Sequence, residues 1–306
     1  MAILVTGASG FVGSSLIETL LNKGEKVIGI GLQYPGFINA DFLKHDNFVF
    51  IHSDMLSVDV NQLKNHNIAC IYNLASLQPA SGINNFEKMY NGNVSLTQKV
   101  ISWAKFLRIE AVIHISTSAV FGDGQTSVLN ERTLVNPTSY YGLSKYVSER
   151  LLEVELSDTG IKTTIIRFPS IFGKNHLGGI IHTLYSLAVT NRQIELYSNG
   201  TRHRNIIYID SVIELLYQVF KNQKVSGKYD VFMAGSSDSK KLVEIAEQII
   251  QLIQSSSEIM LVDKHSPTDS DVFIDSSKVI KRMGFKPWSI DEGLARYVEV
   301  MKNENL

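Results

Sequence analysis

Short runs of apolar and β-branched residues alternate with longer amphipathic stretches through the first half of the chain. Residues 11–22 repeat apolar side chains at helical spacing, with Leu16 and Leu20 on one row and Ile17 and Leu21 on the next, and Gly24 follows as a helix stop. The runs are apolar at nearly every position, which is typical of strands buried on both faces. We interpret six of them as strands: AILVT (2–6), KVIGI (26–30), FVFIH (48–52), ACIYN (69–73), AVIHIS (111–116) and TTIIR (163–167).

The repetition of strand, helix and strand predicts an α/β fold with a doubly wound, parallel, Rossmann-type sheet. Right-handed crossovers then leave a ligand crevice at the carboxyl ends of the strands. After about Phe168 the pattern loosens into turn-rich sequence, a helix in SKKLVEIAEQIIQLI and isolated strands such as YDVFM. We therefore expect a dinucleotide-binding domain over residues 1–167, to which later segments return, and a smaller α/β substrate lobe over 168–306, with a cleft between them.

Charge and composition narrow the class of partner. The 29 Lys and Arg residues nearly balance the 30 Asp and Glu residues, so the chain lacks the basic field that nucleic-acid binding needs. Cys70 is the only cysteine, which excludes an intrachain disulfide. No apolar run approaches the roughly 20 residues of a membrane span, and no basic leader precedes the first strand. We expect a cytoplasmic protein with a small-molecule partner and no nucleic-acid or membrane partner.

The segment TGASGFVG places Gly7, Gly10 and Gly13 between the first strand and the first helix. Glycines there allow a sharp turn and the close approach of a diphosphate, which the amino end of the helix then faces. The spacing is GxxGxxG, a variant of the GxGxxG fingerprint, and a tight structural turn is the alternative. Its position after a strand favours dinucleotide binding.

The usual ribose anchor is an acidic residue at the end of the second strand. Gly31 and Leu32 stand there instead, with no acid and no adjacent arginine, so this site does not separate NAD from NADP. Asp54, after the third strand, could accept a hydrogen bond from an adenine amino group. A loop or helix cap is the equal alternative for Asp54.

Tyr141 and Lys145 lie four residues apart in YYGLSKYVSER, on a predicted helix whose inward stripe would be Leu143, Val147 and Leu151. Residues four apart share a helix face, so the ammonium group can favour the phenolate and let the tyrosine exchange protons near neutral pH. A YxxxK match by chance is the alternative.

A second group of hydroxyls supports a functional role for Tyr141 and Lys145. The strand in HISTSAVFG ends in Ser116, Thr117 and Ser118, at the edge of the sheet where the glycine turn also lies. A hydroxyl there could hydrogen-bond a substrate oxygen, although turn capping is the commoner role. The three features in this order favour one shared site.

With these motifs the chain resembles the extended short-chain dehydrogenase/reductases, the NAD(P)-dependent epimerase/dehydratase family that acts on nucleotide sugars. The resemblance runs nearly end to end, through TGASGFVG, YNLAS, NGNVSLT, ISTSAVFG, YGLSK, RFPSIFG, RNIIYIDSV and MGFKPWSIDEGL. It implies NAD as the cofactor, with NADP not excluded, and a nucleotide-diphosphate sugar as the partner. It also implies a set of cofactor contacts: Gly7, Gly10, Phe11, Val12, Gly13, Asp54, Met55, Leu74, Ala75, Ser76, Asn93, Tyr141 and Lys145.

The resemblance further implies the roles of the reactive residues. Tyr141 would be the acid and base for a sugar hydroxyl, Lys145 would tune it and bind the nicotinamide ribose, and Thr117 would hold the sugar oxygen. Arg204 would contact the substrate diphosphate, and a structural ion pair is the alternative for it. The implied substrate contacts are Thr117, Ser118, Ser170 and Arg204. Two helices, over residues 93–107 and 139–156, would pair in a homodimer.

Departures from the family pattern bear on the reaction. Dehydratases of the family carry an Asp-Glu pair after the catalytic threonine, where this chain has Ser118 and Ala119, so a 4,6-dehydratase would lack its machinery. Ser170 replaces an asparagine, and the family's second arginine is absent, with only His265 nearby. Both changes bear on how the nucleotide sugar would be held.

A nucleotide-sugar epimerase, acting at C4 through a transient 4-keto intermediate, is our leading hypothesis. A 4-keto-sugar nucleotide reductase uses the same residues, and a non-catalytic nucleotide sensor is the third alternative. We expect no metal site, because His182 and His203 lack partners at metal-like spacing. His114 lies mid-strand and is expected to be a satisfied core histidine.

Overall fold

The computed structural model describes residues 1–33, 40–79, 85–124, 128–222, 228–264 and 270–304. The chain forms two compact units, each assembled from separate segments. Unit 1 comprises residues 1–120, 135–167 and 213–232, and unit 2 comprises 121–134, 168–212 and 233–306. One segment of unit 1 ends at residue 167, and residues 213–232 return to that unit, whereas residues 121–134, expected in the first domain, belong to unit 2.

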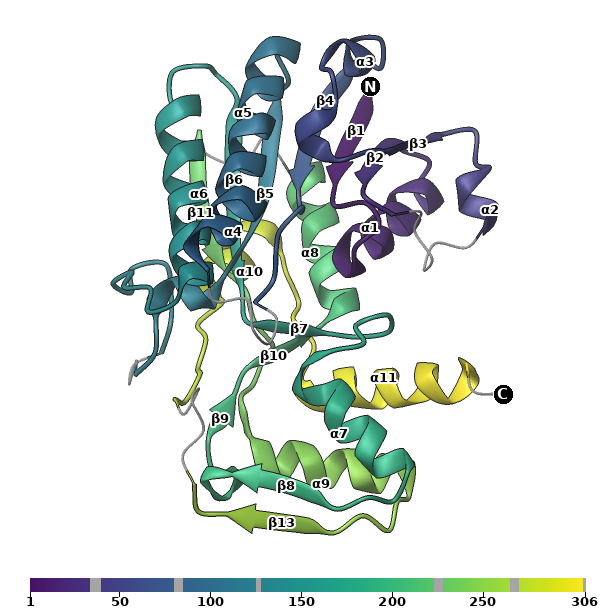
Figure 1. Ribbon diagram of the computed structural model, residues 1–306, viewed down its shortest axis with the longest axis vertical. Helices are drawn as coiled ribbons and strands as arrows, with labels where there is room; N and C mark the ends of the chain where they lie inside the picture. Colours follow the sequence, from purple (N-terminus) through teal and green to yellow (C-terminus); the bar gives the residue numbers. More distant parts are fainter. Residues whose placement is uncertain (34–39, 80–84, 125–127, 223–227, 265–269, 305–306) are drawn as a thin grey trace. The chain divides into compact units, whose positions relative to one another are not determined.

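A seven-stranded sheet is the centre of unit 1 and gives the doubly wound α/β fold expected from the sequence (Figure 1). β1 pairs in parallel with β2 on one side and with β4 on the other, and the strand order is β11-β6-β5-β4-β1-β2-β3. The chain therefore winds in both directions from β1, which creates the switch point where such folds bind ligands. The strands are β1 (Ala2–Thr6), β2 (Lys26–Gly31), β3 (Phe48–His52), β4 (Ile68–Asn73), β5 (Ala111–Thr117), β6 (Lys162–Phe168) and β11 (Tyr229–Met233).

The YDVFM strand corrects one expectation. We expected an isolated strand of the second lobe, and the structure instead adds β11 to the sheet edge beside β6, where the Thr163 amide donates to the Lys228 carbonyl at 2.9 Å. Strand pairing joins residues far apart in the chain, so a five-residue run gives no local sign of its partner.

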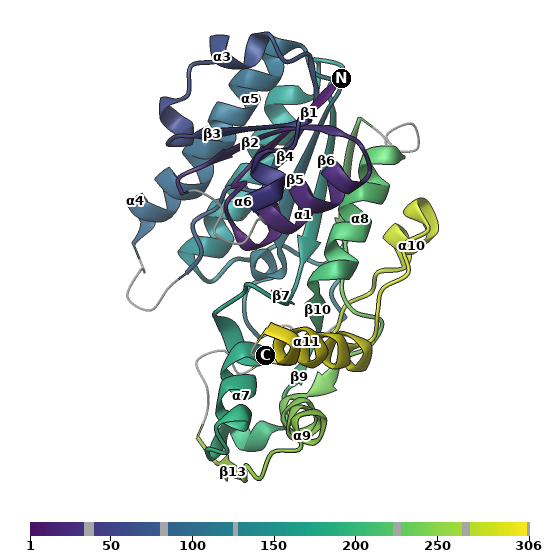
Figure 2. The ribbon, with the colours of Figure 1, turned by 90° about the vertical axis from the view of Figure 1, so that its right-hand side faces the viewer.

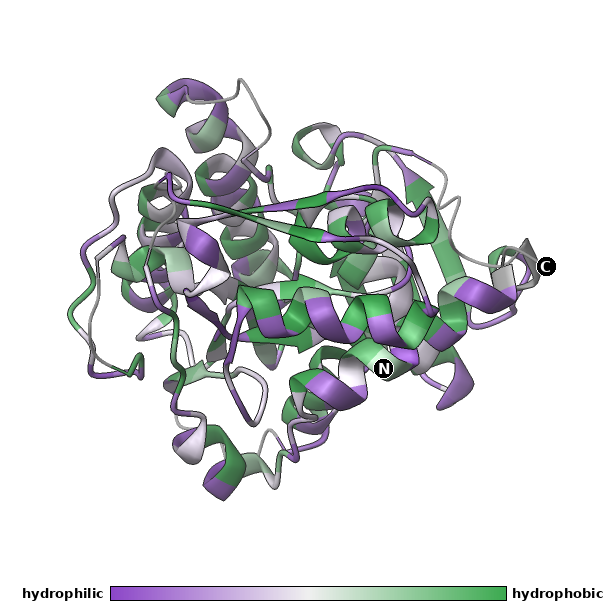
Figure 3. Cartoon of the chain, turned by 90° about the horizontal axis from the view of Figure 1, so that it is seen from below, coloured by the Kyte–Doolittle hydropathy of each residue, from purple (hydrophilic) through white to green (hydrophobic). Residues whose placement is uncertain are grey.

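Helices cover both faces of this sheet. Ala2 and Leu4 pack in a core beneath α5 and α6, and Tyr72 on the opposite face donates from its hydroxyl to the Leu216 carbonyl of α8 at 2.9 Å. In Figure 3, hydrophobic and hydrophilic residues alternate along the helices, which is typical of helices with one buried side. The helices are α1 (Phe11–Asn22), α2 (Ala40–Leu43), a 3-10 helix (Met55–Ser57), α3 (Asn61–Lys64), α4 (Phe86–Met89), a π-helix (Tyr90–Ser95), α5 (Leu96–Leu107), a 3-10 helix (Ser118–Phe121), α6 (Tyr140–Leu156) and α8 (Ile209–Lys221).

Unit 2 combines helices with two-stranded sheets around an aromatic core. The ring of Phe172 contacts those of Tyr208 and Tyr297, and Tyr208 stacks on Trp288. α7 and α9 pack side by side (Figure 2). Its elements are β7 (Ser170–Phe172), α7 (Gly179–Val189), β8 (Ile194–Tyr197), a 3-10 helix (Ser198–Gly200), β9 (His203–Arg204), β10 (Ile206–Tyr208), β12 (Lys240–Lys241), α9 (Leu242–Ile253), β13 (Ile259–Val262), α10 (Ser277–Met283) and α11 (Ile290–Glu304).

Throughout the described ranges, no helix combines the length and the apolar character needed to cross a bilayer.

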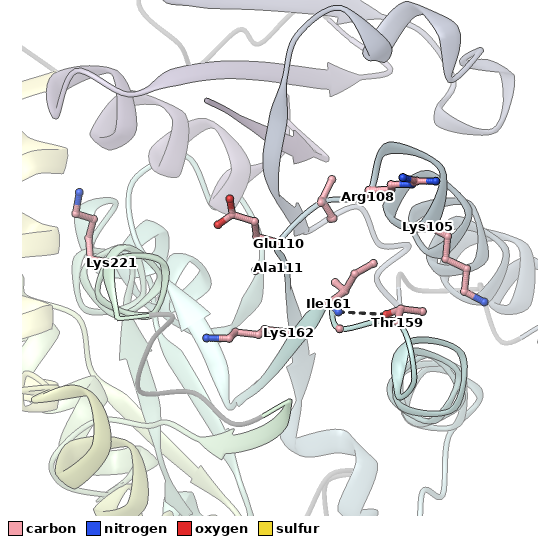
Figure 4. Close-up of a pocket in the computed structure, with 10 residues that line it drawn as sticks. Lys105, Arg108, Glu110, Ala111, Thr159, Ile161, Lys162 and Lys221 are labelled. Carbon is pink, nitrogen blue, oxygen red and sulfur yellow. Dashed lines mark hydrogen bonds between the residues drawn. The ribbon is translucent and has the colours of Figure 1, made fainter.

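An open cavity of about 760 Å³ lies at the amino edge of the sheet, where α5, α6 and α8 end (Figure 4). Several cations line it, and Lys105 pairs with Glu155 at 2.6 Å. Carboxyl ends of helices carry partial negative charge, so cations at this edge complement three helix ends. The positive charge around the cavity is thus explained by the helix ends. The cavity lies at the edge of the sheet opposite the strand ends that carry the reactive residues. Its charged lining residues are Lys105, Arg108, Glu110, Lys162 and Lys221.

Candidate active site

The glycine turn joins the end of β1 to the start of α1. Gly7 has a φ of +66°, and a side chain at Gly13 would bring its Cβ within 3.0 Å of the Gly7 carbonyl oxygen. α1 begins behind Gly10 with no side-chain cap and no acidic residue in its first turn. Its first N–H groups and positive dipole end therefore suit an anion such as a diphosphate.

Thr6, which the sequence analysis did not select, ties this turn to the end of β4. Its hydroxyl oxygen accepts hydrogen bonds from the Leu74 and Ala75 amides, both at 3.1 Å. The Ala75 backbone also lies close to Gly7, so that a Cβ there would approach it to 2.9 Å. The predicted cofactor residues Leu74 and Ala75 are thereby held beside the glycine turn.

Asn93, expected to contact the cofactor, uses its amide within the protein. Its Oδ1 accepts from the Ser76 hydroxyl at 2.9 Å and from the Leu77 amide at 2.8 Å. Its Nδ2 donates to the Ser144 hydroxyl at 2.9 Å and to the Leu77 carbonyl at 3.3 Å. An amide side chain offers two donors and two acceptor positions, so this set engages all four. Asn93 fixes the segment after β4 against α6.

The end of β2 is shaped by Ser9. A Cβ at Gly31 would come within 2.5 Å of the Ser9 hydroxyl, so an acidic anchor could not replace Gly31 without moving Ser9. Asp54 caps the 3-10 helix that follows β3, because its Oδ1 accepts from the Leu56 amide at 2.9 Å. The capping alternative for Asp54 is thus observed, and its contact with adenine stays a prediction.

Thr117 ends β5, and Tyr141 lies in the first turn of α6. Ser139 caps that helix by accepting from the Gly142 amide at 3.1 Å. A Cβ at Gly142 would approach the Ala119 carbonyl oxygen to well under 3.0 Å, so α6 starts directly against the loop that follows Thr117. The Thr117 oxygen also accepts from the Ala119 amide at 3.1 Å, which holds the turn.

The structure brings Tyr141 and Thr117 together, and it adds two residues to them. Hydrogen bonds connect the Tyr141 phenol with the side chains of Gln78, Thr117 and Ser76. Burial raises the pKa of Tyr141, and these three hydrogen bonds lower it in part. The expectation that Lys145 would bring the phenol pKa down is therefore not met in this structure: burial has the largest effect, and the groups that lower the pKa are Gln78, Thr117 and Ser76. Gln78 was missed because its contact depends on the path of the chain after β4.

Lys145 is only 4% exposed and lies on the α6 face that turns inward. Burial lowers the pKa of Lys145 to about 8, and the Glu149 carboxylate opposes that change. The Lys145 charge in turn adds to the effect of burial, which holds the pKa of His114 well below its usual range. His114 Nδ1 lies 2.9 Å from Asn73 Nδ2, while Nε2 has no hydrogen-bond partner among the described residues. His114 is thus a core histidine that is only half satisfied.

The inward face of α6 is polar, which corrects the expected apolar stripe. Leu143, Val147 and Leu151 are only partly buried. The helix instead buries Ser144, Lys145, Ser148 and Glu149, together with Gly142, Leu152 and Leu156. Helical spacing identified the row that carries Tyr141 and Lys145, but hydropathy alone assigned the wrong side to the interior.

Arg204 and Ser170 belong to unit 2. Arg204 lies on β9, pairs in the backbone ladder with Lys240 of β12, and donates from Nη1 to the Ser270 carbonyl. Ser170 begins β7 and is exposed. Their contacts with a substrate stay predictions, as does that of Ser118, and His265 lies outside the described residues.

Sequence comparison decides the family. The profile described as the NAD dependent epimerase/dehydratase family matches residues 3–235, which include the glycine turn, Thr117, Tyr141 and Lys145. The chain belongs to this family. Its cofactor is accordingly NAD.

Individual relatives of this family member are similar along nearly the whole chain. An uncharacterized UDP-glucose epimerase of Bacillus subtilis, YtcB, is 26% identical over 317 residues, covering 99% of this chain and 98% of the relative. UDP-glucuronic acid decarboxylase 1 of Xenopus tropicalis is also 26% identical, covering 99% of this chain and 72% of that protein. The crystal structure of UDP-glucuronic acid 4-epimerase from Bacillus cereus, in complex with UDP-glucuronic acid and NAD, matches with a TM-score of 0.88 at 26% identity, covering 99% and 100% of the two chains. Because relatives with different reactions are equally similar, the site must be used to choose among them.

Proposed function

We propose that this protein is an NAD-dependent nucleotide-sugar 4-epimerase that acts on a UDP-sugar. The observation that carries the proposal is the cluster of Thr117, Ser76 and Gln78 on the Tyr141 phenol, with the buried Lys145 one helical turn away. The loop after β5 supplies a serine and an alanine where a dehydratase would need an acid and a base. These residues support proton exchange with a sugar hydroxyl and no elimination step.

The glycine turn fits the cofactor. The uncapped start of α1 and the Cβ-free approach at Gly10 and Gly13 suit the diphosphate of NAD. When bound, NAD accepts a hydride from the sugar and returns it. Leu74, Ala75 and Ser76 follow β4 at the same edge of the sheet, within reach of a dinucleotide that starts at the glycine turn.

The residues of this chain would handle the proton. In its phenolate form, Tyr141 would take the proton of the C4 hydroxyl during oxidation to the 4-keto sugar. It would give this proton back during reduction at the opposite face of C4, which yields the epimer and leaves the enzyme unchanged. Thr117 holds the reacting oxygen, and the Lys145 ammonium offsets the negative charge on the phenolate.

The substrate class rests on charge in unit 2 and on relatives that bind UDP-sugars. β9 and β12 set Arg204 opposite Lys240, two cations of a kind that suits a diphosphate, and Lys240 also pairs with Asp291. The Bacillus cereus enzyme was crystallised with UDP-glucuronic acid, and YtcB is described as a UDP-glucose epimerase. UDP-glucose and UDP-glucuronic acid are therefore the first substrates to test.

The decisive experiment incubates the protein and NAD with each UDP-sugar deuterated at C4. We expect the C4 epimer to form with deuterium retained at C4 and with no net change in NADH absorbance. Tyr141→Phe should lower kcat about 100- to 10,000-fold, the range for a lost acid–base group. Tyr140→Phe is the matched control, since this neighbouring tyrosine is 43% exposed and lies outside the site. Stoichiometric loss of NADH on a 4-keto sugar would indicate a reductase, and binding without turnover would indicate a sensor.

We also propose that the protein is a homodimer through α4, α5 and α6. Large apolar side chains on these helices are exposed, including Val154 at 63% and Phe106 at 53%. The aromatic rings of Phe86, Tyr90 and Tyr140 add a contiguous cluster. Such a surface is typical of an interface between two copies of a chain.

Sedimentation velocity tests the homodimer. Val154→Glu should shift the protein from dimer to monomer, because a second copy would have to bury the introduced charge. Leu261→Glu, at a side chain that is 53% exposed on β13, is the matched control and should leave the dimer intact. A wild-type protein that sediments as a monomer at high concentration would exclude the proposal.

A further inference from the structure

A buried carboxylate lies directly beneath the Tyr141 and Lys145 pair. Glu149 continues their row along α6, four residues beyond Lys145, and is 1% exposed. Residues spaced by four lie above one another on a helix. No sequence feature singled out this residue, because a glutamate inside a helix is ordinarily part of a solvated face.

Two elements of the sheet hold the Glu149 carboxylate. Arg167 of β6 donates from Nη2 to Oε2 at 2.6 Å and from Nε to Oε1 at 3.0 Å, which forms a bidentate pair. Ser116 of β5 donates its hydroxyl to Oε1. Arg167 is 5% exposed and Ser116 is 3% exposed, so all three groups are withdrawn from water.

This cluster connects the three chain segments of the candidate active site. Ser116 directly precedes Thr117, and Glu149 lies on the helix that carries Tyr141 and Lys145. A bidentate arginine–carboxylate pair has a fixed geometry, so it sets the position of α6 along β5 and β6. A buried ion pair is weak evidence for stability, because apolar groups of similar size often stabilise equally well. The effect of the Arg167–Glu149 pair on the position of α6 is therefore more informative than its effect on stability.

We propose that Glu149 is a positioning residue of the active site, which through Ser116 and Arg167 fixes Tyr141 and Thr117 against each other and places a carboxylate one helical turn from Lys145. The proposal rests on the proposed function, because that function makes the cluster around Tyr141 an active site. Its geometric and electrostatic parts are measurable without any substrate.

The charges around Lys145 agree with this role. Glu149 is the group that raises the pKa of Lys145 against the effect of burial. On β5, Lys145 lies near His114, whose pKa is held well below its usual range, so His114 is neutral and adds no positive charge beside the ammonium. On α6, burial raises the pKa of Tyr141, so the phenol is neutral, and Arg167 of β6 pairs with Glu149 at 2.6 Å. Glu149 thus supplies the negative charge that stabilises the buried ammonium.

The test measures the titration of Lys145 directly in the full-length protein. Lysines are labelled with carbon-13 at the ε position, and the Lys145 resonance is assigned by its loss in Lys145→Met. In the wild type it should titrate at about pH 8. In Glu149→Gln the midpoint should fall by about one pH unit, the shift that one nearby charge produces. Glu149→Asp keeps the charge and should stay near the wild type.

A double variant guards against misfolding. Glu149→Gln leaves Arg167 buried without its carboxylate, which destabilises strongly, whereas Glu149→Gln with Arg167→Met removes both charges together. The double variant should fold, and its Lys145 midpoint should fall by less than that of Glu149→Gln, because loss of the Arg167 charge acts in the opposite direction. An unchanged midpoint in Glu149→Gln, with the double variant at or above the wild type, would overturn the proposal.

Kinetics supply the second measurement. Glu149→Asp retracts the carboxylate by one methylene and should lower kcat about 10-fold or more while KM changes little, because misplacement by about 1 Å affects the reacting groups. Glu149 would be a purely structural residue if Glu149→Asp lowered kcat and raised KM by equal factors while the titration midpoint of Lys145 stayed unchanged. If no variant and no wild type turns over a UDP-sugar, the proposed function fails while the NMR titration still decides the role of Glu149.

Discussion

Lys145 is the residue whose environment has the clearest consequence for stability. Its pKa in the folded protein is about 8, against 10.5 for the unperturbed group, because burial disfavours the ammonium. Below pH 8 both the folded and the unfolded chain bind this proton, and the full penalty of the buried charge is present. Between pH 8 and 10.5 the unfolded chain binds more protons, so this group makes the folded protein more stable as pH rises.

Urea unfolding of the wild type and Lys145→Met, at several pH values from 7 to 10, isolates this contribution. The free energy of unfolding of the wild type should rise relative to that of Lys145→Met as pH increases above 8. The variant should be the more stable of the two near pH 7. Parallel curves across this range would show that Lys145 titrates at its ordinary value in the folded protein.

Asn93 supports a second residue-scale prediction. Replacing Asn93 by Ala removes its four hydrogen bonds to Ser76, Leu77 and Ser144, each of which contributes about 0.5–1.5 kcal/mol, and should lower the free energy of unfolding by about 3 kcal/mol. Asn61→Ala is the control, because that side chain bonds only the exposed Asp59 and should change stability by less than about 0.5 kcal/mol. Urea midpoints compare the two, and equal midpoints would contradict the assignment of Asn93.

These residues also show how far the sequence reaches into the site. The pairing of Tyr141 with Lys145 follows from a spacing of four on one helix, so local pattern was sufficient. Thr6 meets the segment after β4, and Glu149 meets residues 18 and 33 positions away, so their roles appear only once the strands are adjacent. Burial of the phenol was equally invisible in the sequence, and it reversed the expected direction of the Tyr141 pKa.

At the scale of elements, the close start of α6 is the feature that aligns the site. A helix glycine is normally less favourable than alanine by up to about 1 kcal/mol, so Gly142→Ala would stabilise an ordinary helix. Here the added methyl would meet the Ala119 carbonyl oxygen, and overpacking of this kind destabilises by about 1–3 kcal/mol. The second effect should win, because the obstacle is backbone.

We therefore expect Gly142→Ala to lower both the urea midpoint and kcat, since the first turn of α6 carries Tyr141. Val154→Ala, on the exposed side of the same helix, should leave kcat unchanged. A Gly142→Ala protein with wild-type stability would mean that the loop after β5 gives way without strain.

Element by element, the sequence was most reliable where the pattern is local. The expected helix over residues 11–22 and the strand over 2–6 match the structure at both ends. The π-helix over Tyr90–Ser95 was not foreseen, because its extra residue per turn leaves no hydropathy signature. β11 was recognised as a strand but given to the wrong lobe, because its partner β6 lies more than 60 positions earlier in the chain.

At the scale of the whole molecule, unit 2 interrupts a crossover of unit 1. β6 ends at Phe168, α8 begins only at Ile209, after the elements β7 to β10 of unit 2, and β11 pairs beside β6. Without that insertion, β6, α8 and β11 would be one right-handed βαβ unit. Unit 1 is thus continuous in space and discontinuous in sequence.

A chain that ends at residue 167 should therefore fail to fold cooperatively. It lacks β11 at the sheet edge and the buried α8 residues Leu215, Leu216 and Val219, which leaves Tyr72 uncovered. Joining residue 167 to residue 209 through a linker of about six residues, the usual length of such a connection, and ending at residue 233 restores α8 and β11 in full. Urea unfolding followed by circular dichroism should be a single sharp transition for the joined chain and a broad one for residues 1–167. Equally cooperative unfolding of the two chains would show that the rest of the sheet is stable without α8 and β11.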